Sequence, residues 1–112
     1  MSRPRKMSLE EIQKQFLDAV GDIASHWATT QVIARSGETE AQIRCWGTAF
    51  SIMALLDGEH ALLPAYVVTP NPNSDDKEYC KKRGENWLPK APNTKYDIAG
   101  NLHNRLKTHG KK

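Results

Sequence analysis

Positively charged and aromatic side chains occur together in the last third of the chain, and they are the strongest chemical signal in the sequence. Ammonium and guanidinium groups attract phosphate oxygens, and aromatic rings stack on nucleobases, so this combination is typical of sites for nucleotides or nucleic acids. The alternative interpretation is a solvated charged face whose aromatic residues anchor a core. The candidate ligand-binding residues are Lys81, Lys82, Arg83, Trp87, Lys90, Tyr96 and Arg105. Further residues of the same kinds in this region are Lys77, Tyr79, Lys95 and Lys107.

The residue types that usually carry catalysis or bind metals lack the spacing that such sites need. His103 and His109 are six residues apart and do not share a helix face, and His26 and His60 lie in unrelated segments. The sequence contains none of the GxGxxG, GxxxxGK[ST], GxSxG or HExxH patterns. Cys80 lies near three basic residues, which favours a lowered thiol pKa and some reactivity. We nevertheless expect a non-catalytic protein without a metal or a cofactor.

Charge is unevenly distributed along the 112 residues. Residues 1–6 carry a net charge of +3, residues 7–69 carry −5, and residues 70–112 carry +5. Such asymmetry favours an anionic partner for the basic ends, or a contact between oppositely charged parts of two chains. From the length and these shifts in composition we expect residues 1–7 to form a flexible basic arm and residues 8–112 to form a single domain.

The sequence shows no features of a membrane-spanning or secreted protein. No apolar run approaches the ~20 residues that span a bilayer, and the start MSRPRKMSLEE lacks the continuous apolar stretch of a signal peptide. Cys45 and Cys80 lie far apart, and two cysteines do not make the disulfide framework of a small secreted domain. We therefore expect free thiols and a cytoplasmic location.

The first helix is well defined by its sequence. Ser8 and Glu11 have the spacing of a capping box. Apolar residues then recur at intervals of three and four as far as Trp27, so one face of the predicted helix 9–27 is apolar. This helix is expected to pack against the rest of the domain.

The middle of the chain predicts a small antiparallel sheet, from its β-branched residues and its alternation of apolar and polar side chains. Gly47 interrupts this alternation and suggests a bulge. Asp57 and Gly58 predict a tight hairpin turn, and Pro64 places the strand that follows at an edge of the sheet. The expected strands are 29–35, 38–46, 48–56 and 59–69.

Two helices are expected after a proline-containing linker. The first opens at Ser74, Asp75 and Asp76 and ends at Gly84. The second spans 95–109. The predicted fold class is therefore α+β, with an N-terminal amphipathic helix on an antiparallel sheet of about four strands and two C-terminal helices.

These features predict a non-catalytic binding protein that holds a phosphate-bearing ligand, a nucleotide or a nucleic acid, through its basic and aromatic C-terminal part. The unprotected edge strand and the oppositely charged segments also predict a homo-oligomer. The alternative function is that of a small phage-type interaction or inhibitor protein, which blocks a partner protein through its sheet edge.

The predicted order of an N-terminal helix, a small sheet and a C-terminal helix is similar to that of small phage proteins that sequester nucleotide signals of bacterial defence, such as the Thoeris anti-defence type. This resemblance implies capture of a nucleotide signal. It concerns the architecture alone, so no site residue is carried over from those proteins.

Overall fold

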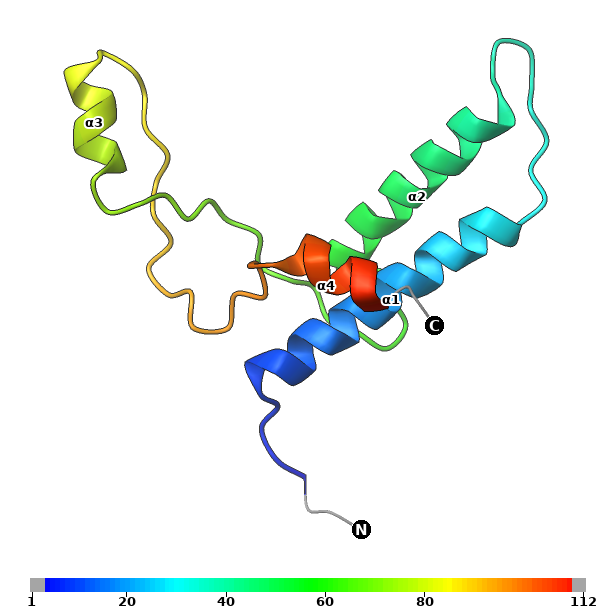
Figure 1. The fold of residues 1–112 in the computed structure, drawn as a ribbon, viewed down its shortest axis with the longest axis horizontal. Coiled ribbons are helices and arrows are strands. Elements are labelled where there is room, and N and C mark those ends of the chain that lie inside the picture. The colour runs from blue at the N-terminus through cyan, green and yellow to red at the C-terminus, as the bar shows by residue number, and fades with distance from the viewer. Residues whose placement is uncertain (1–3, 110–112) are drawn as a thin grey trace. The chain divides into compact units, whose positions relative to one another are not determined.

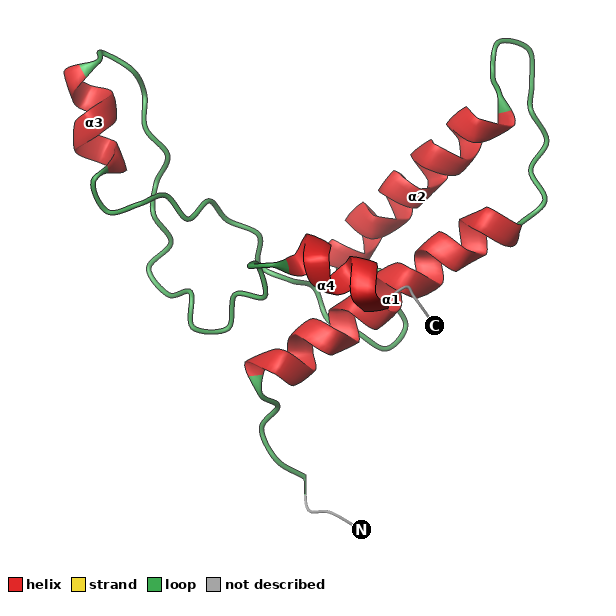
Figure 2. Cartoon of the chain, in the orientation of Figure 1, coloured by secondary structure: helices red, strands yellow, loops and turns green. Residues whose placement is uncertain are grey.

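The computed structural model describes residues 4–109, and within this range it contains four helices and no strand (Figures 1 and 2). The α+β prediction is therefore wrong, and the described part of the chain is all-α. The chain divides into two compact units: unit 1 comprises Met1–Tyr66 and Ile98–Lys112, and unit 2 comprises Val67–Asp97. The helices are α1 (Leu9–Thr29), α2 (Glu40–Leu56), α3 (Asp76–Lys82) and α4 (Leu102–His109).

Helix α1 begins where the sequence predicts, and its capping box is confirmed. The backbone N–H of Glu11 donates to the Ser8 hydroxyl at 3.2 Å, and the Ser8 N–H donates to the Glu11 carboxylate at 3.0 Å. The Arg5 guanidinium also binds both oxygens of this carboxylate, at 2.7 and 2.8 Å. The helix extends to Thr29, two residues beyond the predicted end.

Helix α2 occupies the sequence in which strands 38–46 and 48–56 were predicted, so those two predictions are wrong. Its start has a second capping box: the Gln42 N–H donates to the Thr39 hydroxyl at 3.1 Å, and the Thr39 N–H donates to the Gln42 side chain at 2.8 Å. The apolar run that follows contains no charged residue between Arg44 and Asp57. A nearly continuous apolar run fits a buried strand as well as a helix, so its periodicity does not distinguish the two. The capping box at its start is the local signal that favours a helix.

Gly47 lies inside α2 and marks a close helix contact, not a bulge. A Cβ atom at this position would lie 2.5 Å from Cζ2 of the Trp27 ring, so the indole needs the space that glycine leaves. The indole Nε1–H donates to the Ser51 hydroxyl at 3.0 Å. Trp27 therefore fixes the end of α1 against α2 by both contact and a hydrogen bond.

Asp57 and Gly58 end α2 and do not form a hairpin turn. Gly58 has a φ of +89°, its N–H donates to the Leu55 carbonyl at 3.2 Å, and the Glu59 N–H donates to the Ala54 carbonyl at 2.9 Å. These two hydrogen bonds define a Schellman motif. The hairpin prediction is wrong because a glycine with positive φ serves a helix C-terminus as well as a type I′ turn.

The remaining predicted strands, 29–35 and 59–69, are also wrong. Thr29 is the last residue of α1, and the chain from 30 to 39 connects α1 to α2 without strand pairing. Residues 59–69 are likewise neither helix nor strand. The described residues therefore contain no sheet edge. The predictions of an oligomer and of an inhibitor that both depended on such an edge lose that support. The architectural resemblance to the phage proteins loses its basis with the sheet.

The core of unit 1 gathers apolar side chains from three distant stretches of sequence. Phe16 meets Tyr66 edge to face, with 5.2 Å between ring centroids. The Gln13 side-chain amide donates to the carbonyls of Ile98 at 2.8 Å and Gly100 at 3.1 Å, which ties the chain before α4 to α1. Both α2 and α4 pack against α1. The buried cluster consists of Phe16, Ala19, Val20, Leu55 and Leu63.

Unit 2 contains α3, with irregular chain on either side of it and no buried residue. The predicted start and end of this helix are confirmed. The Gly84 N–H donates to the Lys81 carbonyl at 3.1 Å and the Glu85 N–H donates to the Cys80 carbonyl at 2.9 Å, which closes the helix as the sequence predicts.

Helix α4 is shorter than the predicted helix 95–109, because it begins only at Leu102. Gly100 and Asn101 have φ values of 123° and 57°, and a right-handed helix cannot pass through either conformation. Among the described residues, no helix has the combination of length and apolar character that a membrane span requires.

Candidate functional site

A recess of about 300 Å³ lies in unit 2, where the chain that enters α3 meets the chain that leaves it. Its lining is mixed, with two lysines, an amide, a hydroxyl and an indole beside apolar side chains. No carboxylate is among the lining side chains, so the local charge of the recess is positive. The lining residues are Pro72, Asn73, Ser74, Lys77, Trp87, Leu88, Pro89 and Lys90.

Trp87 supplies the aromatic surface of this recess. The ammonium groups of Lys77 and Lys81 each lie 5.4 Å from the centroid of its ring, within the range of cation–π attraction. The two lysines are four residues apart, so α3 presents both from one face. Trp87 remains 43% exposed, and part of the indole is therefore available to a ligand.

Arg83 is engaged by residues close to it in sequence. Its Nε–H donates to the Glu85 carboxylate at 2.5 Å, and an Nη1–H donates to the Tyr79 hydroxyl at 3.0 Å. The bond to Glu85, followed by the bond to Tyr79, raises the pKa of Arg83. The charge of this guanidinium is thus balanced by Glu85, which lies just after the C-terminal end of α3.

The seven candidate residues do not all come together. Trp87 and Lys90 line the recess, and Lys81 faces the Trp87 ring. Lys82 and Arg83 lie at the end of α3 and are exposed, but they are not part of the lining.

Two further candidates are not among the lining residues of the recess. Tyr96 is 42% exposed and has the Lys95 ammonium group 5.7 Å from its ring centroid. Arg105 belongs to α4, in unit 1, and is half-buried. The polar lining residues that the candidate set omits are Asn73, Ser74 and Lys77, and the spacing of Lys77 four residues before Lys81 was the signal for the last of these.

The expectation of a lowered thiol pKa at Cys80 is wrong. Partial burial, together with the Asp76 and Glu85 carboxylates, raises the pKa of its thiol above the ordinary value and outweighs the opposite effect of Arg83. The protonated thiol donates weakly to the Asp76 carboxylate at 3.8 Å. Cys45 and Cys80 are both free, and the part of the chain that the structure describes holds no group of three or more metal-binding side chains.

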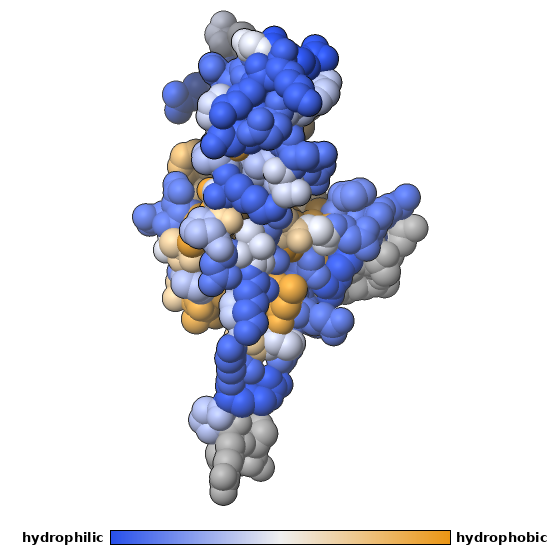
Figure 3. All heavy atoms as spheres, turned by 90° about the vertical axis from the view of Figure 1, so that its left-hand side faces the viewer, coloured by the Kyte–Doolittle hydropathy of each residue, from blue (hydrophilic) through white to orange (hydrophobic). Residues whose placement is uncertain are grey.

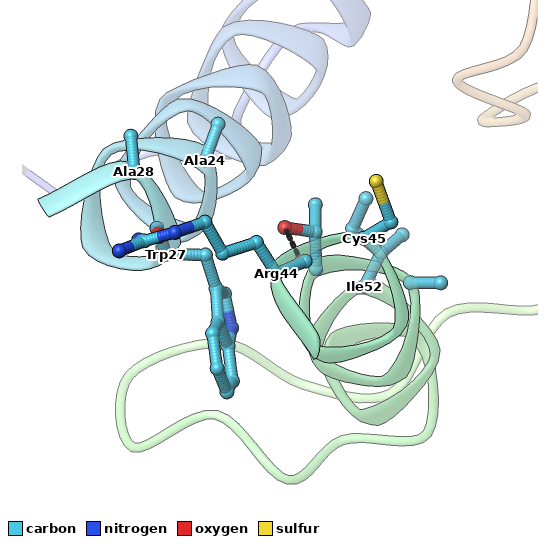
Figure 4. A pocket seen from close by; sticks show the side chains of 8 residues that line it. Ala24, Trp27, Ala28, Arg44, Cys45 and Ile52 are labelled. Carbon is cyan, nitrogen blue, oxygen red and sulfur yellow. Dashed lines mark hydrogen bonds between the residues drawn. The ribbon is translucent and has the colours of Figure 1, made fainter. Parts of the chain in front are cut away.

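Unit 1 has a different kind of hollow, an apolar groove of about 460 Å³ between α1 and α2 (Figure 4). The Arg44 side chain reaches across from α2 to α1, where it donates a hydrogen bond to the Trp27 carbonyl. That contact places a positive charge at the C-terminal end of α1, where the helix dipole favours it. The lining residues are Ala24, Trp27, Ala28, Arg44, Cys45, Thr48, Ala49 and Ile52.

The surface of α3, at the top of Figure 3, is almost wholly hydrophilic. No protein-family model, curated protein or solved structure matches the chain. Functional inference therefore depends on these two hollows and on the surfaces around them.

Proposed function

We propose that unit 2 is a non-catalytic binding module for a phosphate-bearing ligand, with Lys77 and Lys90 at the phosphate and Trp87 against a planar ring. The observation that carries this proposal is the recess itself, which brings two ammonium groups and an accessible indole together without a carboxylate in the lining. Ammonium groups attract phosphate as point charges, and an indole face stacks on any nucleobase.

The size of the recess favours a small ligand. Its volume of about 300 Å³ lies at the lower end of the range for small-molecule sites, which suits a mononucleotide or a single unit of a strand better than a duplex. Asn73 and Ser74 add an amide and a hydroxyl that can hydrogen-bond to a sugar or a base edge.

Unit 2 as a whole is only weakly basic, with six basic and five acidic side chains in residues 67–97. Affinity for phosphate therefore depends on where these charges lie. Glu85 is paired with Arg83, and Asp76 contacts Cys80, so two of the acidic groups are engaged within or beside α3. The lysines of the recess keep a local positive field.

The experiment is a calorimetric titration of the full chain with adenosine monophosphate, repeated with inorganic phosphate and at rising salt concentration. We expect the nucleotide to bind more tightly than phosphate alone, because only the nucleotide has a ring to place on Trp87. Affinity for both should fall as salt rises, since ionic contacts are screened. Trp87→Ala should remove the advantage of the nucleotide over phosphate.

A charge-matched pair of variants tests the position of the site. Lys77→Ala combined with Lys90→Ala should weaken nucleotide binding by roughly tenfold or more, since ionic hydrogen bonds contribute about 1.5–3 kcal/mol. Lys82→Ala combined with Lys95→Ala is the control, because it also removes two positive charges, from residues that do not line the recess. Equal losses in the lysine pair and in the control, or no loss in the pair, would refute the recess as the binding site.

A further inference from the structure

The outer face of α2 carries large apolar side chains that the described residues of unit 1 leave exposed. Trp46, Phe50 and Met53 are 76%, 74% and 55% exposed, and they follow one another at intervals of four and three residues. They therefore form a continuous ridge on one side of the helix. The opposite side of α2 carries Leu55, which is 2% exposed and part of the core. A helix that is apolar on both sides is typical of one that is buried on both sides.

A row of small side chains lies next to this ridge. Cys45 and Ala49 are exposed, line the apolar groove between α1 and α2, and directly precede Trp46 and Phe50 in the sequence. On the α1 side of the groove the exposed residues are Ala24 and Ala28 (Figure 4). The same surface thus offers both a protruding ridge and a hollow of about 460 Å³, large enough for aromatic side chains.

We propose that unit 1 binds a second copy of this chain, with the α2 helices antiparallel and the ridge of each copy in the groove of the other. A two-fold axis places the same patch on both subunits, so the patch must be complementary to itself. A surface that holds a ridge of large side chains beside a groove of small ones meets this condition. Antiparallel pairing centred between Ala49 and Phe50 also places Trp46 of one copy opposite Met53 of the other.

The exposed apolar area of α2 explains why the proposed interface must include both the ridge and the groove. Trp46 and Phe50 together expose on the order of 300 Å², because an aromatic side chain presents about 150–250 Å². A specific interface needs about 800 Å² from each partner. Trp46 and Phe50 alone are too small for such an interface, so a stable pairing must also bury Met53, the small residues of the groove and the adjoining α1 surface.

Charge also favours a second copy over a charged partner. Arg44 is the only charged side chain in the groove lining, and it already donates to the Trp27 carbonyl. The parts of unit 1 that the structure describes carry seven basic and eight acidic side chains, so two copies do not repel each other strongly. This surface replaces the sheet edge on which the sequence-based expectation of a homo-oligomer depended.

The test is sedimentation velocity of the full chain across micromolar concentrations. We expect a species of twice the chain mass that dissociates on dilution. Phe50→Glu, on the ridge, and Ala28→Trp, which fills the groove from α1, should each raise the dissociation constant roughly tenfold or more, as loss of a central interface contact does. Val68→Glu is the matched control, because Val68 is 72% exposed and lies in unit 2.

Circular dichroism distinguishes dissociation from unfolding, and both altered positions are exposed, so the helical signal per residue should be unchanged. A wild-type chain that stays monomeric overturns the proposal, whether or not it binds lipid vesicles or another protein. A dimer that persists in folded Phe50→Glu and Ala28→Trp overturns it as well. So does a dimer that Val68→Glu dissociates as strongly as they do.

Discussion

Unit 1 and unit 2 are organised by different interactions. In unit 1 the described apolar side chains from α1, α2 and the chain around Leu63 are buried together, although they are far apart in sequence. In unit 2 none of residues 67–97 is buried, and the contacts join neighbours such as Arg83 and Glu85. Burial of apolar area makes the structure of unit 1 cooperative, whereas the structure of unit 2 depends on helix caps and exposed charges.

Two tryptophans show what this difference does to one residue type. Trp27 fits against Gly47 in the helix contact, and its indole N–H is bonded to Ser51. Trp87 is exposed, with two ammonium groups near its ring. The first side chain is thus part of the packing of unit 1, and the second is available for binding.

The largest expected effect tests the buried side of unit 1. Leu55→Ala should lower the free energy of unfolding by about 3 kcal/mol, because it removes apolar atoms from the core and leaves a cavity. Leu62→Ala, at a position 87% exposed, should change it by less than about 0.5 kcal/mol. Urea unfolding followed by circular dichroism, at one protein concentration, measures both. Similar losses in the two variants would contradict the placement of the core.

Gly47→Ala tests the contact between α1 and α2. Alanine gains about 1 kcal/mol over glycine in a helix, but overpacking against the Trp27 ring costs about 1–3 kcal/mol, so we expect a net loss of stability. In a Trp27→Leu background the clash is absent, and the same substitution should then stabilise the chain. Thermal unfolding of the four chains completes a double-mutant cycle, and a stabilising Gly47→Ala in the wild type would refute the contact.

The two units also differ in how their helices begin. Thr39→Ala removes the side-chain cap of α2 and should lower stability by about 1 kcal/mol. Asp75→Ala at the start of α3 should have a smaller effect, because the Asp75 side chain makes no capping hydrogen bond. Hydrogen exchange at the first amides of each helix distinguishes the two cases. Each rate is compared with that of the same amide in the wild type. If Asp75→Ala accelerated exchange at α3 more than Thr39→Ala accelerated it at α2, this difference would be contradicted.

The smallest effect concerns an exposed ion pair of unit 1. The Arg5 guanidinium, with help from Ser8, lowers the pKa of Glu11 from the ordinary 4.5 to about 2. A carboxyl whose pKa falls on folding stabilises the fold above pH 4.5, and that contribution is lost as the pH falls from 4.5 towards 2. Melting temperatures measured over this range should fall less for Glu11→Gln than for the wild type, and identical pH profiles would contradict the pair.

Local sequence signals predicted the start of α1 and the bounds of α3, and they failed for α2, although α2 also begins with a capping box. Ser8 and Glu11 predicted the start of α1, and Gly84 predicted the end of α3. Strand 38–46 was predicted from its alternation of apolar and polar side chains, and strand 48–56 from an apolar run that fits a helix equally well. The capping box of Thr39 and Gln42 was present in the sequence and marks the correct solution. For the candidate site, composition indicated Trp87 and a group of nearby basic residues. It did not indicate that Lys77 and Lys81 are the ones that lie over the Trp87 ring.

By itself the sequence determined where α1 begins, where α3 begins and ends, and which residue types give the last third of the chain its positive charge and its aromatic side chains. Those properties depend on neighbours within about one helical turn. The tertiary structure alone decided that Gly47 receives the Trp27 ring and that α2 presents one apolar face to α1 and another to solvent. Such contacts join residues far apart in the chain, and their energy comes from burial that no local pattern records.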